Sequence, residues 1–231
     1  MAIPRKLIVT GCARSGTTLL HSLMGYFKGV KVYRYAETLP ARFNEKFQAK
    51  FADGANDQHS GKQYVVIKRP QFHPGDERYF TIEDLLRDDY RVINIVRDCR
   101  DVLVSRHPDD PSIYWVEPER WLAAVGETLR HDESPDVLTL KYEDLVMEPD
   151  QCMTDIADFL KTEYSPDYIN FFRGDDARSY LDKAVMDGAR AIHAGSIGNW
   201  RSPEHAARVQ TLMTTRGNEL KDGLVRLGYA L

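Results

Sequence analysis

The chain has 231 residues, and its 31 Lys and Arg residues against 35 Asp and Glu residues give a formal net charge of −4. With 42% hydrophobic and 29% charged residues, it is too apolar for a disordered tail and too polar for an integral membrane protein. We expect no membrane span and no general nucleic-acid partner, although an acidic chain can still hold a local anion site. Three cysteines are too few for a disulfide framework and favour a reducing, cytoplasmic compartment.

Short apolar strands alternate with helical stretches along the chain. We predict strands over residues 6–10, 30–34, 64–68, 92–96 and 137–141. Helices are predicted over residues 17–27, 82–86, 101–106, 119–129, 150–160 and 203–226, with irregular chain over 174–202. Continuous apolar strands separated by helices are typical of a parallel sheet covered on both faces. The sequence therefore predicts one three-layer α/β domain over residues 1–231, with ligands beyond the carboxyl ends of its strands.

The first predicted strand leads into the loop GCARSGTT, residues 11–18, and then into an apolar helix. Backbone N–H groups in such a loop and the start of a helix suit a phosphate or sulfate group. The loop has the glycine spacing of a Walker A loop, but Thr17 stands in place of the lysine and Arg14 is the substitute cation. The pattern predicts an anion site formed by Arg14, Ser15, Gly16, Thr17 and Thr18.

A second candidate anion site follows the fourth predicted strand, in the segment RDCRDVLVSR. Arg97 stands at the end of the strand, and Ser105 lies eight residues later on the predicted helix. This spacing can return the Ser105 hydroxyl to the edge where the Arg97 guanidinium lies, so that both hold one phosphate. Taken alone, the segment is also typical of a charged helix start with Asp101 near its N-cap.

The sequence RSGTTL after a first strand resembles the 5′-phosphosulfate loop of sulfotransferases that use 3′-phosphoadenosine 5′-phosphosulfate (PAPS). Its arginine is similar to that of the tyrosylprotein and several bacterial branches, and the Arg97–Ser105 pair resembles the family's 3′-phosphate motif. The resemblance implies a P-loop nucleoside-triphosphatase-like fold, PAPS as co-substrate and no metal. It further implies sulfuryl transfer to a hydroxyl of a small molecule, glycan or peptide, and it leaves the oligomeric state open.

Two further segments resemble the same family. Tyr142, in the segment LKYEDL, matches a tyrosine that lies near the adenine, although a strand-end tyrosine can also simply pack on the next helix. The segment HAGSIGNWR, residues 193–201, resembles a nucleotide-binding loop, but His193 and Ala194 replace an Arg-Lys pair that reaches the 3′-phosphate. The candidate contacts in this loop are Gly195, Ser196 and Arg201, and a purely structural glycine-rich turn is the alternative.

Sulfuryl transfer needs cations at the leaving-group oxygen and a base for the attacking hydroxyl. Arg14 is the first candidate cation, and Lys68, at the end of its predicted strand, is the second. By resemblance to tyrosylprotein-type members, Glu37 is the predicted base. His73 is its rival, because soluble phenol-type members place a histidine shortly after the lysine.

Two other functions are compatible with a phosphate-binding loop. The first is a P-loop kinase acting on a small molecule, against which the missing Walker lysine and the Arg97–Ser105 pair both count. The second is a nucleotide-binding module that has kept the loop and lost the chemistry. The sequence favours the sulfotransferase over both.

Overall fold

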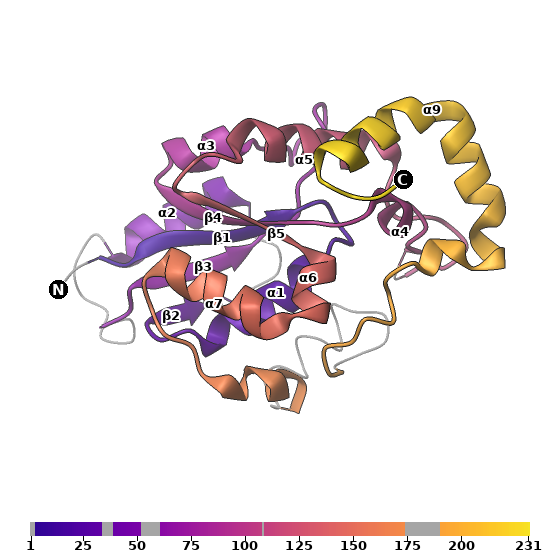
Figure 1. Ribbon diagram of the computed structural model, residues 1–231. Helices are drawn as coiled ribbons and strands as arrows, with labels where there is room; N and C mark the ends of the chain where they lie inside the picture. Colours follow the sequence, from indigo (N-terminus) through magenta and orange to yellow (C-terminus); the bar gives the residue numbers. More distant parts are fainter. Residues whose placement is uncertain (1–2, 34–38, 52–60, 108, 174–189) are drawn as a thin grey trace.

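The computed structural model describes residues 3–33, 39–51, 61–107, 109–173 and 190–231. Five strands form one parallel sheet, in the order β2-β3-β1-β4-β5 (Figure 1). The strands are β1 (Arg5–Gly11), β2 (Val30–Val32), β3 (Tyr64–Lys68), β4 (Tyr90–Val96) and β5 (Val137–Lys141). All five predicted strands are present. β1 is one residue longer than predicted at each end, β4 begins two residues earlier, and β2 ends at Val32 rather than at residue 34, which lies outside the described residues.

The three central strands are buried on both faces. Successive side chains of a strand point to opposite faces, and here Leu7 and Val9 join one apolar cluster while Ile8 joins another. Burial on both faces explains why these strands are continuous apolar runs rather than alternating ones. The predicted parallel α/β sheet with covered faces is therefore confirmed.

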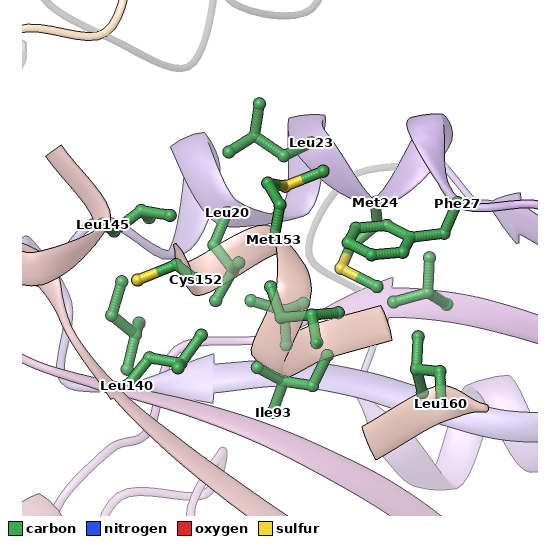
Figure 2. Close-up of a cluster of buried hydrophobic side chains, with 14 of the residues drawn as sticks. Leu20, Leu23, Met24, Phe27, Ile93, Leu140, Leu145, Cys152, Met153 and Leu160 are labelled. Atoms are coloured by element: carbon green, nitrogen blue, oxygen red, sulfur yellow. The ribbon is translucent and has the colours of Figure 1, made fainter. Parts of the chain in front are cut away.

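One face of the sheet is covered by α1 (Thr17–Leu23), α6 (Tyr142–Met147) and α7 (Pro149–Leu160). Figure 2 shows side chains of α1 and α7 pointing toward one another above the strands. The cluster includes Leu20, Leu23, Met24, Phe27, Ile93, Leu140, Leu145, Cys152, Met153 and Leu160. This packing fixes the start of α1, and with it the loop that precedes α1.

The helices on the other side form two apolar clusters. One cluster includes strand residues such as Ile8 and Val65, and the other joins helices to Cys12 and Ala13 in the loop that follows β1. These helices are α2 (Pro40–Phe51), α3 (Ile82–Arg87), α4 (Cys99–Leu103), α5 (Pro118–His131) and α9 (Ala206–Arg226). Short 3₁₀ segments complete the described chain: η1 (Met24–Tyr26), η3 (Pro166–Arg173), η4 (Asn199–Arg201) and η5 (Pro203–His205). Within the described ranges, no helix carries an apolar stretch long enough to cross a membrane.

Local sequence signals explain several helix ends. Thr81 and Asp84 form a capping box at α3, in which each side chain accepts from the other residue's backbone N–H at 3.0 Å. Pro118 and Pro149 occupy the first positions of α5 and α7, where a missing N–H costs nothing. Lys161 ends α7 in a left-handed conformation, with φ of 53°.

Three helix predictions need correction, and two helices were not predicted. The helix predicted over residues 17–27 ends at Leu23 and is followed by the 3₁₀ turn η1. The helix predicted over residues 101–106 spans Cys99–Leu103, because the Asp98 side chain accepts from the Arg100 N–H and caps it there; Ser105 therefore lies beyond the helix. The helices α2 and α6 were not predicted. For α6 the reason is that the helix is short and that Lys141, at its N-cap, makes no side-chain hydrogen bond to it. The predicted terminal helix begins with the 3₁₀ turn η5 before α9.

Candidate active site

The loop between β1 and α1 turns through three residues with left-handed backbone conformations. These are Gly11, Arg14 and Gly16, with φ of 135°, 70° and 94°. The Ser15 N–H donates to the Cys12 carbonyl at 3.2 Å and closes the turn. A side chain at Gly11 would overlap the backbone carbonyl of Ile95 in β4, so only glycine lets the loop leave the sheet there.

The ring of Tyr142 covers Gly16. A Cβ atom at Gly16 would lie 2.5 Å from Tyr142 Cδ2, far closer than carbon atoms approach. Tyr142 is the first residue of α6, is buried, and also lies 4.2 Å from the guanidinium carbon of Arg97, measured to the ring centroid. The tyrosine therefore packs the first loop and Arg97 against one another.

We expect Gly16→Ala to lower the unfolding free energy by about 2 kcal/mol, because an alanine adopts the left-handed conformation poorly and also meets the Tyr142 ring. A loss of this size lowers Tm by about 4–8 °C. The matched control is Gly25→Ala, whose Cβ would lie 3.6 Å from Val32, an ordinary contact. Equal melting temperatures for the two variants would contradict the prediction, and Gly16→Ala with Tyr142→Leu should recover part of the loss.

Arg97 joins the first loop to the loop formed by residues 193–201. It follows β4 directly and is 7% exposed. Its guanidinium donates to the Arg14 carbonyl at 3.0 Å and to the Ser196 carbonyl. Its own carbonyl accepts from the buried indole of Trp121 at 3.1 Å. Arg97 is thus held at its backbone and at its side chain.

Asp101, in α4, forms hydrogen bonds to the loop over residues 193–201. Its carboxylate accepts from the N–H groups of Gly198 at 2.8 Å and Trp200 at 3.1 Å, and it lies 3.9 Å from Arg97. The residue is 2% exposed, and a carboxylate buried to this extent is tolerated only when paired and hydrogen-bonded. The loop is therefore attached to α4 through charged hydrogen bonds.

A cavity of about 380 Å³ opens between the two loops. Eight residues predicted from the sequence line it: Arg14, Gly16, Thr17, Thr18, Arg97, Ser105, Tyr142 and Ser196. The remaining charged lining residues are Asp101, Arg106, Arg190 and Glu204. Because four arginines face two carboxylates, and one of these carboxylates is already hydrogen-bonded, the cavity suits an anion of small-molecule size.

Lys68 lies against the first loop. It ends β3, which pairs in parallel with β1 so that Lys68 stands opposite Val9. The side chain is mostly buried, and its Nζ donates to Thr18 Oγ1 at 3.0 Å. Sheet pairing therefore brings this lysine to the first loop, where it contacts Thr18, one of the residues that line the cavity.

Comparison with known proteins agrees with this arrangement. The family model of the sulfotransferase domain matches residues 4–202. The chain belongs to the sulfotransferase family. It is similar in structure to the sulfotransferase domain of the Synechococcus PCC 7002 olefin synthase, with a TM-score of 0.63, 20% identity, and coverage of 100% of this chain and 97% of that one.

Two further solved structures are similar to this sulfotransferase. The sulfotransferase domain from the curacin biosynthetic pathway has a TM-score of 0.57 and 17% identity, with both chains covered completely. Mouse sulfotransferase SULT7A1 complexed with PAP also has a TM-score of 0.57 and 17% identity, covering 98% of this chain and 89% of that one. These likenesses confirm the predicted P-loop-like α/β fold. No sequence among the curated proteins matches the chain.

Three residues predicted to bind the nucleotide lie outside the cavity wall of this sulfotransferase. The Ser15 hydroxyl is buried beneath the first loop, beside a small void that Asn94 also lines. Arg201 folds back onto its own loop, with its guanidinium 4.5 Å from the Trp200 ring. Gly195 donates its N–H to His193 Nδ1 at 3.1 Å, which shapes the loop.

Of the two candidate bases, Glu37 and His73, the structure describes only His73. Glu37 lies outside the described residues. His73 is exposed, and its Nδ1 lies 2.8 Å from the Pro74 carbonyl oxygen in the segment that follows β3. The described chain thus gives His73 no contact with the cavity, whose lining residues are given above.

Sequence reasoning missed the residues that support Arg97. Glu143 accepts from the Asp98 N–H at 3.1 Å and from the Tyr229 hydroxyl at 2.8 Å, so the C-terminal segment is tied to the start of α4. Burial and the adjacent Glu143 carboxylate raise the pKa of Tyr229, which keeps its hydroxyl a donor. The only sequence signal for Asp101 is its position four residues after Arg97, and a residue near the start of a helix explains that position equally well.

The three cysteines are free and buried. Burial raises the pKa of Cys12 and that of Cys152 each to about 12, and it raises the pKa of Cys99 as well. All three thiols are therefore protonated near neutral pH and pack as small apolar side chains.

Proposed function

We propose that this chain transfers the sulfuryl group of PAPS to a hydroxyl group of an acceptor. The observation that carries the proposal is one cavity lined by cationic and hydroxyl side chains from two segments, the first loop and the segment after β4. Arg14, Thr17 and Thr18 belong to the first loop, and Arg97 and Ser105 belong to the segment after β4. A nucleotide phosphorylated at both the 5′ and the 3′ positions matches this pair of sites, and the membership of the sulfotransferase family supports it.

In the proposed reaction the residues of the first loop bind the 5′-phosphosulfate, which supplies the activated sulfuryl group. The acceptor oxygen attacks sulfur in line as the bond to the 5′-phosphate oxygen breaks, and the leaving nucleotide is adenosine 3′,5′-bisphosphate (PAP). Arg14 and Lys68 face the negative charge that develops on the leaving oxygen, and fixed cations there lower the barrier. Glu37 is the proposed base for the acceptor hydroxyl, with His73 as the rival.

The kinase alternative is less well supported. Thr17 occupies the place of the Walker lysine, and the cation of the loop is Arg14. The family match and the anion site beyond β4 both favour PAPS over ATP as the nucleotide.

A thermal-shift titration with PAP and, separately, with ATP and Mg²⁺ tests the nucleotide. A ligand at about 100 times its Kd stabilises the folded protein by about 2.7 kcal/mol, so we expect PAP to raise Tm by about 5–10 °C. A response to ATP and Mg²⁺ alone would overturn the proposal.

Release of PAP from PAPS, with phenol, glycan and peptide acceptors, then separates an enzyme from a binding module, which would bind PAP and release none from PAPS.

The proposal includes the acceptor class and the compartment. Small-molecule, glycan and peptide hydroxyls are all proposed acceptors and are covered by the acceptor panel. A cytoplasmic location is proposed because the three cysteines are free thiols, as expected in a reducing compartment.

A further inference from the structure

Arg106 occupies a defined place in the wall of the cavity, directly after Ser105. The segment around it forms a narrow hairpin, in which Arg106 and Tyr114 form an antiparallel bridge and the Trp115 N–H donates to the Ser105 carbonyl at 2.9 Å. The Arg106 guanidinium carbon lies 3.9 Å from the centroid of the Tyr114 ring, and its Nη1 donates to the Ser112 carbonyl at 3.4 Å. The hairpin and the ring therefore position this arginine.

Arg106 lines the same cavity as Arg97 and Ser105 and follows Ser105 directly in the chain. Ser105 Oγ donates to the Asp101 carbonyl at 3.2 Å, and the Asp101 carboxylate lies 3.9 Å from Arg97. All four residues line the cavity. The cavity wall therefore contains the Arg97 guanidinium, the buried Asp101 carboxylate and, one residue after Ser105, the side chain of Arg106.

Among the described residues, no carboxylate pairs with Arg106. Arg97 is already committed, because it faces the Asp101 carboxylate and donates to two backbone carbonyls. Arg106, by contrast, contacts a ring and a carbonyl but no carboxylate among the described residues. A phosphate dianion needs more positive charge than a neutralised Arg97 provides.

The loop over residues 193–201 does not supply that charge. It contributes His193, Ser196 and Asn199 to the cavity wall, but neither lysine nor arginine. Its one arginine, Arg201, is stacked on Trp200 instead. A cation for the second phosphate must therefore come from another segment, and Arg106, which follows Ser105 in the chain, lines the same cavity.

We propose that Arg106 binds the 3′-phosphate of the nucleotide, together with Arg97 and Ser105. This inference rests on the proposed function, since it assigns a residue to one phosphate of the proposed nucleotide. Arg106 then acts as the determinant that separates a 3′-phosphorylated nucleotide from one that lacks the 3′-phosphate.

The experiment measures the affinities of two probes, PAP and AMP, by calorimetry, because AMP lacks only the 3′-phosphate. We expect Arg106→Gln to weaken PAP binding about 10- to 30-fold, as expected for a lost charged hydrogen bond, and AMP binding less than about twofold. Arg106→Lys should recover part of the PAP affinity. The matched control is Arg208→Gln, because Arg208 contacts the same Tyr114 ring at 4.8 Å but pairs with Glu117 and does not line the cavity.

Each other outcome overturns a defined part of the inference. An equal loss for PAP and AMP, or an equal loss in Arg208→Gln, would mean that Arg106 only supports the hairpin. If PAP affinity is unchanged in Arg106→Gln but falls in Arg190→Gln, the 3′-phosphate is bound by Arg190, which also lines the cavity, and not by Arg106. If the wild-type protein binds no PAP, the proposed function itself fails. Melting temperatures without ligand verify that each variant is folded.

Discussion

Lys68→Met is expected to slow the release of PAP from saturating PAPS by about 10²–10³-fold, with PAP affinity reduced by less than about tenfold. The lysine is buried at the end of β3, and its Nζ donates to Thr18 Oγ1 in the first loop. In the proposed reaction, negative charge grows on the 5′-phosphate oxygen as the sulfuryl group leaves. A cation fixed at that oxygen stabilises the transition state more than the bound substrate, so its loss lowers turnover more than affinity.

The measurement is the rate of PAP formation per bound nucleotide, with PAP affinity taken separately by calorimetry. Lys141→Met is the matched control, because Lys141 also ends a strand at this edge of the sheet, in β5, and donates to the Gly228 carbonyl instead. Lys68→Arg should restore part of the rate, since it restores the charge. A rate per bound nucleotide that is unchanged in Lys68→Met would contradict a role in the transfer step.

The sheet and one half of the site could be predicted because they depend on short-range signals. Apolar runs of five residues define buried parallel strands, and the carboxyl ends of such strands meet at one edge. Residues at the end of a strand or directly after it, such as Lys68 and Arg97, therefore lie at one edge, and the glycine-containing loop after β1 brings Arg14 to the same edge. Their spacing in the chain was sufficient to predict this.

The remaining residues of the site depend on contacts between segments far apart in the chain. Asp101 holds a loop nearly one hundred residues further along, and Glu143 joins α4 to the C-terminal segment through Tyr229. No local pattern in the sequence marks such partners. A residue at a helix start explains Asp101 equally well, and only its hydrogen bonds to Gly198 and Trp200 show its role in holding the loop. Likewise, the place of Arg106 depends on a hairpin that has no glycine-based turn signal.

Asp101→Asn is expected to be the most damaging single change in the support of the cavity. The two carboxylate oxygens accept from Gly198 and Trp200, and an asparagine offers only one acceptor oxygen. Its NH₂ group would face a backbone N–H in a buried place, and Arg97 would lose its counter-charge. Breaking one member of a buried charged network costs about 3–5 kcal/mol.

We therefore expect Asp101→Asn to lower Tm by about 6–12 °C or more, and to weaken PAP binding by about 10²-fold as the loop separates from Arg97. Thermal denaturation and calorimetry with PAP measure the two effects. The direction is informative, because removing a negative charge from the wall of an anion-binding cavity should by itself strengthen binding.

Glu204→Gln provides the comparison that separates charge from structure. Glu204 also lines the cavity, but its side chain is 67% exposed, and in the described part of the chain its ionic contact is with His205 Nε2, at 3.6 Å. Removing its charge should leave Tm nearly unchanged and PAP affinity equal or slightly higher. If the two variants behave alike, Asp101 acts through its charge alone. If only Asp101→Asn loses stability and affinity together, the loop that it holds is part of the nucleotide site.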